Sequence, residues 1–205
     1  MSYENFSIER IENDFDIEVV DVANLLKEVK SIKPSEMLTR LLEQFIPLGT
    51  SIGTEKARSE FIIAPILAEI RKITHNKISL FSGNKFDVDK SKGLNGYCDF
   101  ILSASKTQLN LSAPVMVIVE AKNDNLHSGL GQCMAEMIAA QIYNDRKEKP
   151  IKYIDGCVTT GSIWKFLRLT DKLIQLDDKE YYLDQLPKIL GIFMESVGEL
   201  GIVDN

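Results

Sequence analysis

The stretch PVMVIVEAK, residues 114–122, is apolar on both faces until it ends in two charged residues. Such a pattern is typical of a central strand in a sheet that helices cover on both sides. Side chains alternate along a strand, so we expect Glu120 and Lys122 to point to the same side. Burying either charge alone would be costly. An internal ion pair, or a metal ion with its substrate phosphate, must therefore compensate them.

The stretch GYCDFIL, residues 96–102, shows the same anomaly because Asp99 interrupts an apolar run. Two neighbouring strands would each aim one carboxylate at a shared point, and hard oxygen ligands of this kind suit Mg²⁺. Phosphodiester cleavage needs a cation to stabilise the phosphate, an activated water and a positive group nearby. We therefore expect Asp99 and Glu120 to bind Mg²⁺ and Lys122 to orient or help deprotonate the water.

Hydrophobic periodicity around these strands predicts one α/β core. Strands are expected near 78–88, with a turn at Ser82-Gly83-Asn84, and near 97–104, 114–122, 153–160 and 163–170. Helices are expected from Met37 to a stop at Pro47 and Gly49, over 54–73 with Pro65 as a kink or first turn, and over 129–146 and 184–198. This order predicts an α/β protein: a three-layer-like α/β/α sandwich around a central mixed sheet, with extra N-terminal helices.

The start of the chain differs in charge from the rest. Residues 1–30 carry eight acids against three bases, so they account for −5 of the net charge of −6. An apolar pattern there, Val22, Leu25, Leu26 and Val29, predicts a short helix. We expect an acidic N-terminal extension over 1–34 and a single domain over 35–205. At 205 residues with 44% hydrophobic content, the chain is suited to one substantial core.

Taken together, Asp99 and, 21 positions later, Glu120-Ala121-Lys122 resemble the D…(D/E)-x-K signature of the PD-(D/E)XK nuclease superfamily. The resemblance covers residues 54–170 and implies a restriction-endonuclease-like fold and a nuclease that uses Mg²⁺, with Mn²⁺ as a substitute. It also implies site roles for Glu60 on the helix before the sheet and Gln132 on the helix after it. The Ala121 carbonyl joins the implied metal ligands, and Glu60 would hold a second metal or a metal-bound water.

The sequence departs from the family pattern at two positions. Cys98 stands where the signature has proline, which changes no ligand. Glu136 stands where the exonuclease branch usually has a tyrosine, four residues after Gln132, which weakens assignment to that branch.

The expected partner is nucleic acid, with DNA favoured over RNA, and a homodimer would suit cleavage of both strands. Eight bases against five acids between 53 and 93 indicate a basic surface; Lys56, Arg58, Arg71, Lys72 and Lys77 are the first candidates for backbone contacts. The alternative is a non-catalytic module that keeps the same sheet for binding or assembly. For Asp99, Glu120 and Lys122 the corresponding alternative is a structural ion pair.

The remaining features are interpreted as structural. Cys98, Cys133 and Cys157 are odd in number and widely spaced, so we expect reduced, buried thiols. The only histidines, His75 and His127, are expected at the surface, and neither a zinc cluster nor a His-centred nuclease is expected. No stretch is long and apolar enough for a membrane span, and no secretory pattern is present, so a cytoplasmic location is expected.

Overall fold

The computed structural model describes residues 2–105 and 107–198. One mixed sheet forms its centre, with strand order β1-β7-β6-β5-β4-β3-β2 and β8 beside β6. The strands are β1 (Glu18–Val22), β2 (Ser79–Lys85), β3 (Tyr97–Ser103), β4 (Val115–Ala121), β5 (Ile154–Thr159), β6 (Ile163–Thr170), β7 (Leu173–Asp177) and β8 (Tyr181–Tyr182). Pairs β4–β5 and β1–β7 are parallel and the others antiparallel.

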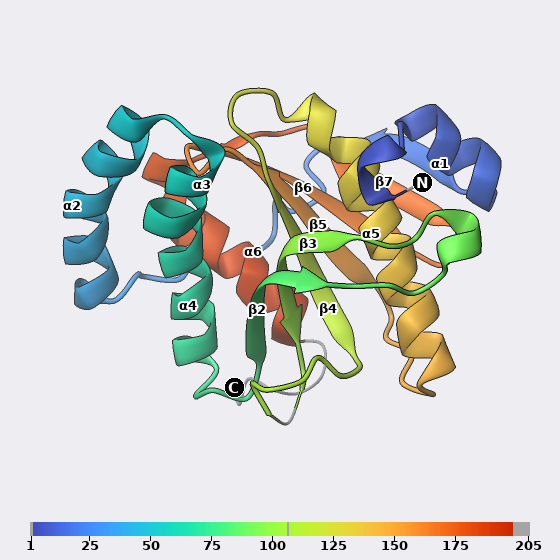
Figure 1. The fold of residues 1–205 in the computed structure, drawn as a ribbon. Coiled ribbons are helices and arrows are strands. Elements are labelled where there is room, and N and C mark those ends of the chain that lie inside the picture. Colours follow the sequence, from blue (N-terminus) through green and yellow to red (C-terminus); the bar gives the residue numbers. More distant parts are fainter. Residues whose placement is uncertain (1, 106, 199–205) are drawn as a thin grey trace.

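Helices cover both faces of this sheet (Figure 1). One face packs against α1 (Ile8–Phe15) and α5 (His127–Arg146), and the other against α4 (Ala64–Ile73) and α6 (Leu186–Gly198). Outside α4 lies α2 (Glu36–Ile52). Shorter pieces are η1 (Tyr3–Asn5), α3 (Glu55–Arg58), the π-helical η2 (Ser59–Ile63), η3 (Lys90–Lys92) and η4 (Leu183–Gln185). The predicted α/β sandwich is confirmed.

Strand β4 is buried along its whole length, as the PVMVIVEAK pattern predicts. Its alternating side chains divide between two hydrophobic cores. Ile118 belongs to the core under α5, whereas Val117 and Val119 belong to the core under α4 and α6. The strands and helices predicted between residues 97 and 198 match observed elements, with ends that differ by at most two residues.

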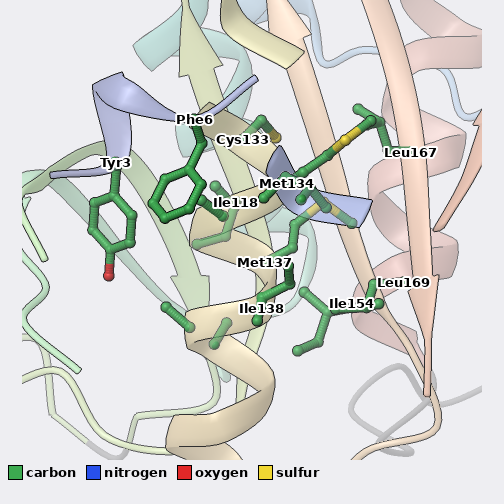
Figure 2. Close-up of a cluster of buried hydrophobic side chains, with 14 of the residues drawn as sticks. Tyr3, Phe6, Ile118, Cys133, Met134, Met137, Ile138, Ile154, Leu167 and Leu169 are labelled. Atoms are coloured by element: carbon green, nitrogen blue, oxygen red, sulfur yellow. The ribbon is translucent and has the colours of Figure 1, made fainter. Parts of the chain in front are cut away.

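The first thirty residues are part of the packed structure. Figure 2 shows Tyr3 and Phe6 beside α5, in a buried cluster with Cys133, Met134 and Met137. The N-terminal segment lies close to the backbone of α5 at Gly131, where an added Cβ would overlap the Phe6 carbonyl. The hydroxyl of Tyr3 donates a hydrogen bond to the Phe86 carbonyl at 2.6 Å. The domain boundary at residue 34 stays a prediction, and the predicted domain end at 205 lies outside the described residues.

Three local predictions are wrong. Helix α2 does not stop at Pro47 but continues to Ile52, because Pro47 lies on the exposed side, where water can satisfy the carbonyl that loses its partner. Gly53 ends it in a left-handed conformation, φ 71°. Residues 18–29 form β1 and a turn instead of a helix, because β1 pairs with β7. No turn breaks β2 at residues 82–84; Gly83 has a φ of 60° there, and the strand continues to Lys85.

The helix predicted over 54–73 is confirmed, because the chain is helical without a break from Glu55 to Ile73. It consists of α3, the π-helical η2 and α4, and Pro65 lies in the first turn of α4, as expected.

Candidate active site

Asp99 and Glu120 lie on neighbouring strands at the same level of the sheet. The register pairs Phe100 of β3 with Val119 of β4, so the two acids oppose each other one position further along. Asp99 is anchored because its Oδ2 accepts a hydrogen bond from the Ala121 backbone N–H at 2.8 Å. Glu120 is 1% exposed. The register thus brings both carboxyl groups to one point at the end of β4.

Lys122 completes this group from the residue that follows β4. Its ammonium group forms an ion pair with Glu120 and donates to Gln132 Oε1 at 3.4 Å. Its backbone N–H donates to the Thr159 carbonyl of β5 at 2.8 Å, which extends the pairing of the strands by one residue. Asp99, Glu120, Lys122 and Gln132 are therefore brought together.

Burial dominates the electrostatics of both carboxyl groups. Burial and the nearby Asp99 charge raise the pKa of Glu120 to about 8, and Lys122 offsets only part of this effect. Burial also raises the pKa of Asp99, against the opposing effects of the Ala121 N–H and Lys122. Burial alone would lower the pKa of Lys122, but the Glu120 carboxylate raises it above its ordinary value. Lys122 is accordingly a cation at neutral pH, better suited to orienting a group than to removing a proton.

Glu55 was not among the acids predicted for the site, yet it interacts electrostatically with Lys122 and Asp99 more directly than Glu60 does. Burial raises the pKa of Glu55, Lys122 lowers it and Asp99 raises it. The Asn123 backbone N–H lowers this pKa as well. Glu60 forms an ion pair with Lys56 at 2.8 Å, and its side chain is 53% exposed. The two glutamates look alike in the sequence, and only their positions in the first turn of α3 and in η2 separate them.

A pocket of about 250 Å³ opens beside these acids. The helical segment contributes Glu55, Lys56, Ser59, Glu60 and Ala64, and the strands contribute Ser82, Gly83, Asp99 and Phe100. Both Glu60 and Asp99 thus reach the same pocket, although Glu60 is directed toward Lys56.

The donor set suits a hard cation. Glu120 Oε2 is a buried oxygen with no hydrogen-bond partner, and Asp99 supplies a second carboxylate opposite it. Mg²⁺ commonly binds through one or two carboxylates, keeping waters and substrate phosphates as its other ligands. Within residues 2–105 and 107–198, no three His, Cys, Asp or Glu side chains gather as a metal-binding group. The fit rests on the Asp99–Glu120 pair alone, and the Ala121 carbonyl stays a predicted ligand.

Gly129 of α5 makes room for the Lys122 side chain. A Cβ there would lie 2.7 Å from Val158 Cγ1 and 3.1 Å from both Cγ and Cε of Lys122. We expect Gly129→Ala to displace the ammonium group and lower any turnover that depends on it by about tenfold or more, because small misplacements of a positioned group are costly. Steady-state rates would be compared with those of Ser128→Ala, an exposed neighbour; equal rates for both variants would contradict this role for Gly129.

The predicted basic cluster is divided. Lys56 and Arg58 lie on α3 near the pocket, and Arg58 donates to the Thr160 carbonyl at 3.2 Å. Arg71, Lys72 and Lys77 lie at or beyond the other end of α4, roughly 20 Å away at the rise per residue of a helix. His75 and His127 are exposed, and the three cysteines are buried and free, as expected.

The fold and the site define a mixed α/β protein in which a buried Glu120 and the partly buried Asp99 and Lys122 meet at the end of the central strand. Comparison with family models, curated proteins and solved structures finds no significant match to the chain. No helix among the described residues is both long and apolar enough to cross a membrane.

Proposed function

We propose that this protein is a metal-dependent nuclease of the PD-(D/E)XK type that hydrolyses phosphodiester bonds, with DNA as the favoured substrate. The observation that carries the proposal is the pairing of Asp99 with Glu120 across β3 and β4, with the Lys122 ammonium group against Glu120. Burial raises the pKa of both carboxyl groups and so disfavours their charged forms, and a bound cation would favour those forms again.

Each residue has a distinct role in the proposed reaction. Asp99 and Glu120 would hold Mg²⁺ or Mn²⁺, which when bound would stabilise charge on the phosphate and favour ionisation of an attacking water. Asp99 is held in place by the Ala121 N–H, so it needs little rearrangement. Lys122 is held by Glu120 and Gln132, and its remaining N–H would orient the water or a phosphate oxygen. Glu55 and Glu60 line the pocket on the other side.

The test is cleavage of supercoiled plasmid, linear duplex, single-stranded DNA and RNA by the full chain with Mg²⁺ or Mn²⁺. Cleavage that EDTA abolishes is expected, and the preferred substrate identifies the class. Absence of cleavage of all four substrates with both ions would contradict the proposal and favour the alternative, a module with the same sheet that binds without catalysis.

A further inference from the structure

Glu136 is a fully buried acid directly behind the candidate site. It lies on α5 one turn after Gln132 and is 0% exposed. Its Oε1 accepts a hydrogen bond from Gln132 Nε2 at 3.1 Å, and its Oε2 has no hydrogen-bond partner. Burying a carboxyl group with one oxygen unsatisfied is costly. Packing alone would be served better by an apolar side chain, so the contacts of Glu136 indicate a role other than packing.

The contacts form a chain from Glu136 to the site. Gln132 donates through Nε2 to Glu136 and accepts through Oε1 from the Lys122 ammonium group at 3.4 Å. A glutamine amide has one accepting end and one donating end. Rotated by half a turn, it would present its NH₂ group to the ammonium group and its oxygen to the Glu136 oxygen. Only the observed orientation satisfies both neighbours.

We propose that Glu136 is a positioning residue, which fixes the Gln132 amide so that its oxygen faces Lys122 and holds the ammonium group beside Glu120. This inference rests on the proposed nuclease function for its effect on rate. Of the three N–H donors of the ammonium group, one goes to Glu120 and one to Gln132. These two hydrogen bonds fix the direction of the third N–H group. Without Glu136, the Gln132 amide would lose its fixed orientation. The Lys122 ammonium group would then lose its second hydrogen-bond acceptor.

The effect on rate is tested with variants of similar size. Glu136→Met removes the acceptor and should lower kcat by about tenfold while KM for DNA changes less than about twofold, because the substrate does not touch Glu136. Glu136→Gln can still present an oxygen to Gln132 and should retain activity within about threefold of wild type. Loss of a buried, half-satisfied carboxyl group is not expected to prevent folding; Glu136→Leu provides a second apolar variant.

A double-mutant cycle separates positioning from general disturbance of the core. In a protein that already carries Gln132→Met, Glu136→Met should lower kcat no further, because the two residues act through one contact. Additive losses would overturn the proposal, as would wild-type kcat in Glu136→Met. Asn144→Met is the matched control: Asn144 is buried on the same helix and bonds both the N–H and the carbonyl of Val115 at 2.8 Å, far from the site. The Asn144→Met variant should change kcat by less than about twofold once the rate is corrected for the fraction of protein that is folded.

A readout independent of activity keeps the two proposals separable. In NMR spectra of the wild-type protein, the Gln132 side-chain amide protons should exchange slowly with solvent because the group is 8% exposed and hydrogen-bonded. Exchange should stay slow in Glu136→Gln and become markedly faster in Glu136→Met. Unchanged exchange in Glu136→Met would overturn the positioning role even in an active enzyme. Altered exchange in a protein that cleaves no nucleic acid would support the contact and contradict the nuclease function.

Discussion

Lys122→Met is expected to lower metal-dependent DNA cleavage by about 100-fold or more, the scale of losing one charge-stabilising donor in an active site. The ammonium group is the cation that contacts Glu120, and its pKa is raised by that carboxylate. Methionine keeps most of the side-chain volume but donates no hydrogen bond. The pKa of the buried Glu120 is already about 8 beside Lys122, and losing that cation would raise it further, so no unpaired charge is left buried and the fold should survive.

Initial rates of plasmid nicking measure this effect, with melting temperature as the check on folding. Lys188→Met is the matched control, since this lysine donates to the carbonyls of Lys27 and Val29 at 3.0 and 2.6 Å, away from the site. The control should lose stability but retain specific activity. Wild-type cleavage by Lys122→Met would remove the lysine from the mechanism.

Glu120→Gln is expected to abolish stabilisation by Mg²⁺ and to make the metal-free protein more stable at alkaline pH. In the folded protein the pKa of Glu120 is about 8, above its ordinary value of 4.5. The folded state therefore keeps a proton that the unfolded state has released between these two values. The stability from this group is fully present below pH 4.5 and is lost as pH rises through 8. Glutamine cannot ionise, so the variant escapes this loss, which is on the order of a few kcal/mol.

Thermal melts from pH 5 to 9, with and without Mg²⁺, measure both effects. In wild type, the Mg²⁺-induced rise in melting temperature should increase with pH, because binding requires the ionised carboxylate. Glu60→Gln is a useful comparison, since Glu60 is paired with Lys56 and half exposed, and it should retain most of the Mg²⁺ effect. An equal Mg²⁺ effect in wild type and Glu120→Gln would contradict the assignment of Glu120 as a ligand.

The central strands and α5 could be predicted from sequence because their apolar patterns are long and most of their residues are buried. Strand β4 carries seven buried residues in succession. The same apolar context made Asp99, Glu120 and Lys122 conspicuous, since a charge inside a buried strand needs a compensating partner. Their proximity in the fold followed from the prediction that the two strands are neighbours.

The edge of the sheet could not be predicted in this way. Strand β1 is only half buried, and it is defined by parallel pairing with β7, about 150 residues later in the chain. The sequence also did not separate Glu55 from Glu60. Helical pitch changes at the π-helical segment η2, so the direction of each side chain depends on an irregularity that periodicity does not reveal.

The most direct test of the Asp99–Glu120 metal site is a time course of nucleic-acid cleavage in Mn²⁺ by wild type and Asp99→Asn, run side by side on the preferred substrate. Asparagine keeps the shape of Asp99 and an oxygen for the Ala121 N–H, but it removes the negative charge. We expect cleavage by wild type and a loss of at least about 100-fold in the variant, with unchanged melting temperature in EDTA. Cleavage at equal rates by both proteins, or by neither, would contradict the Asp99–Glu120 metal site.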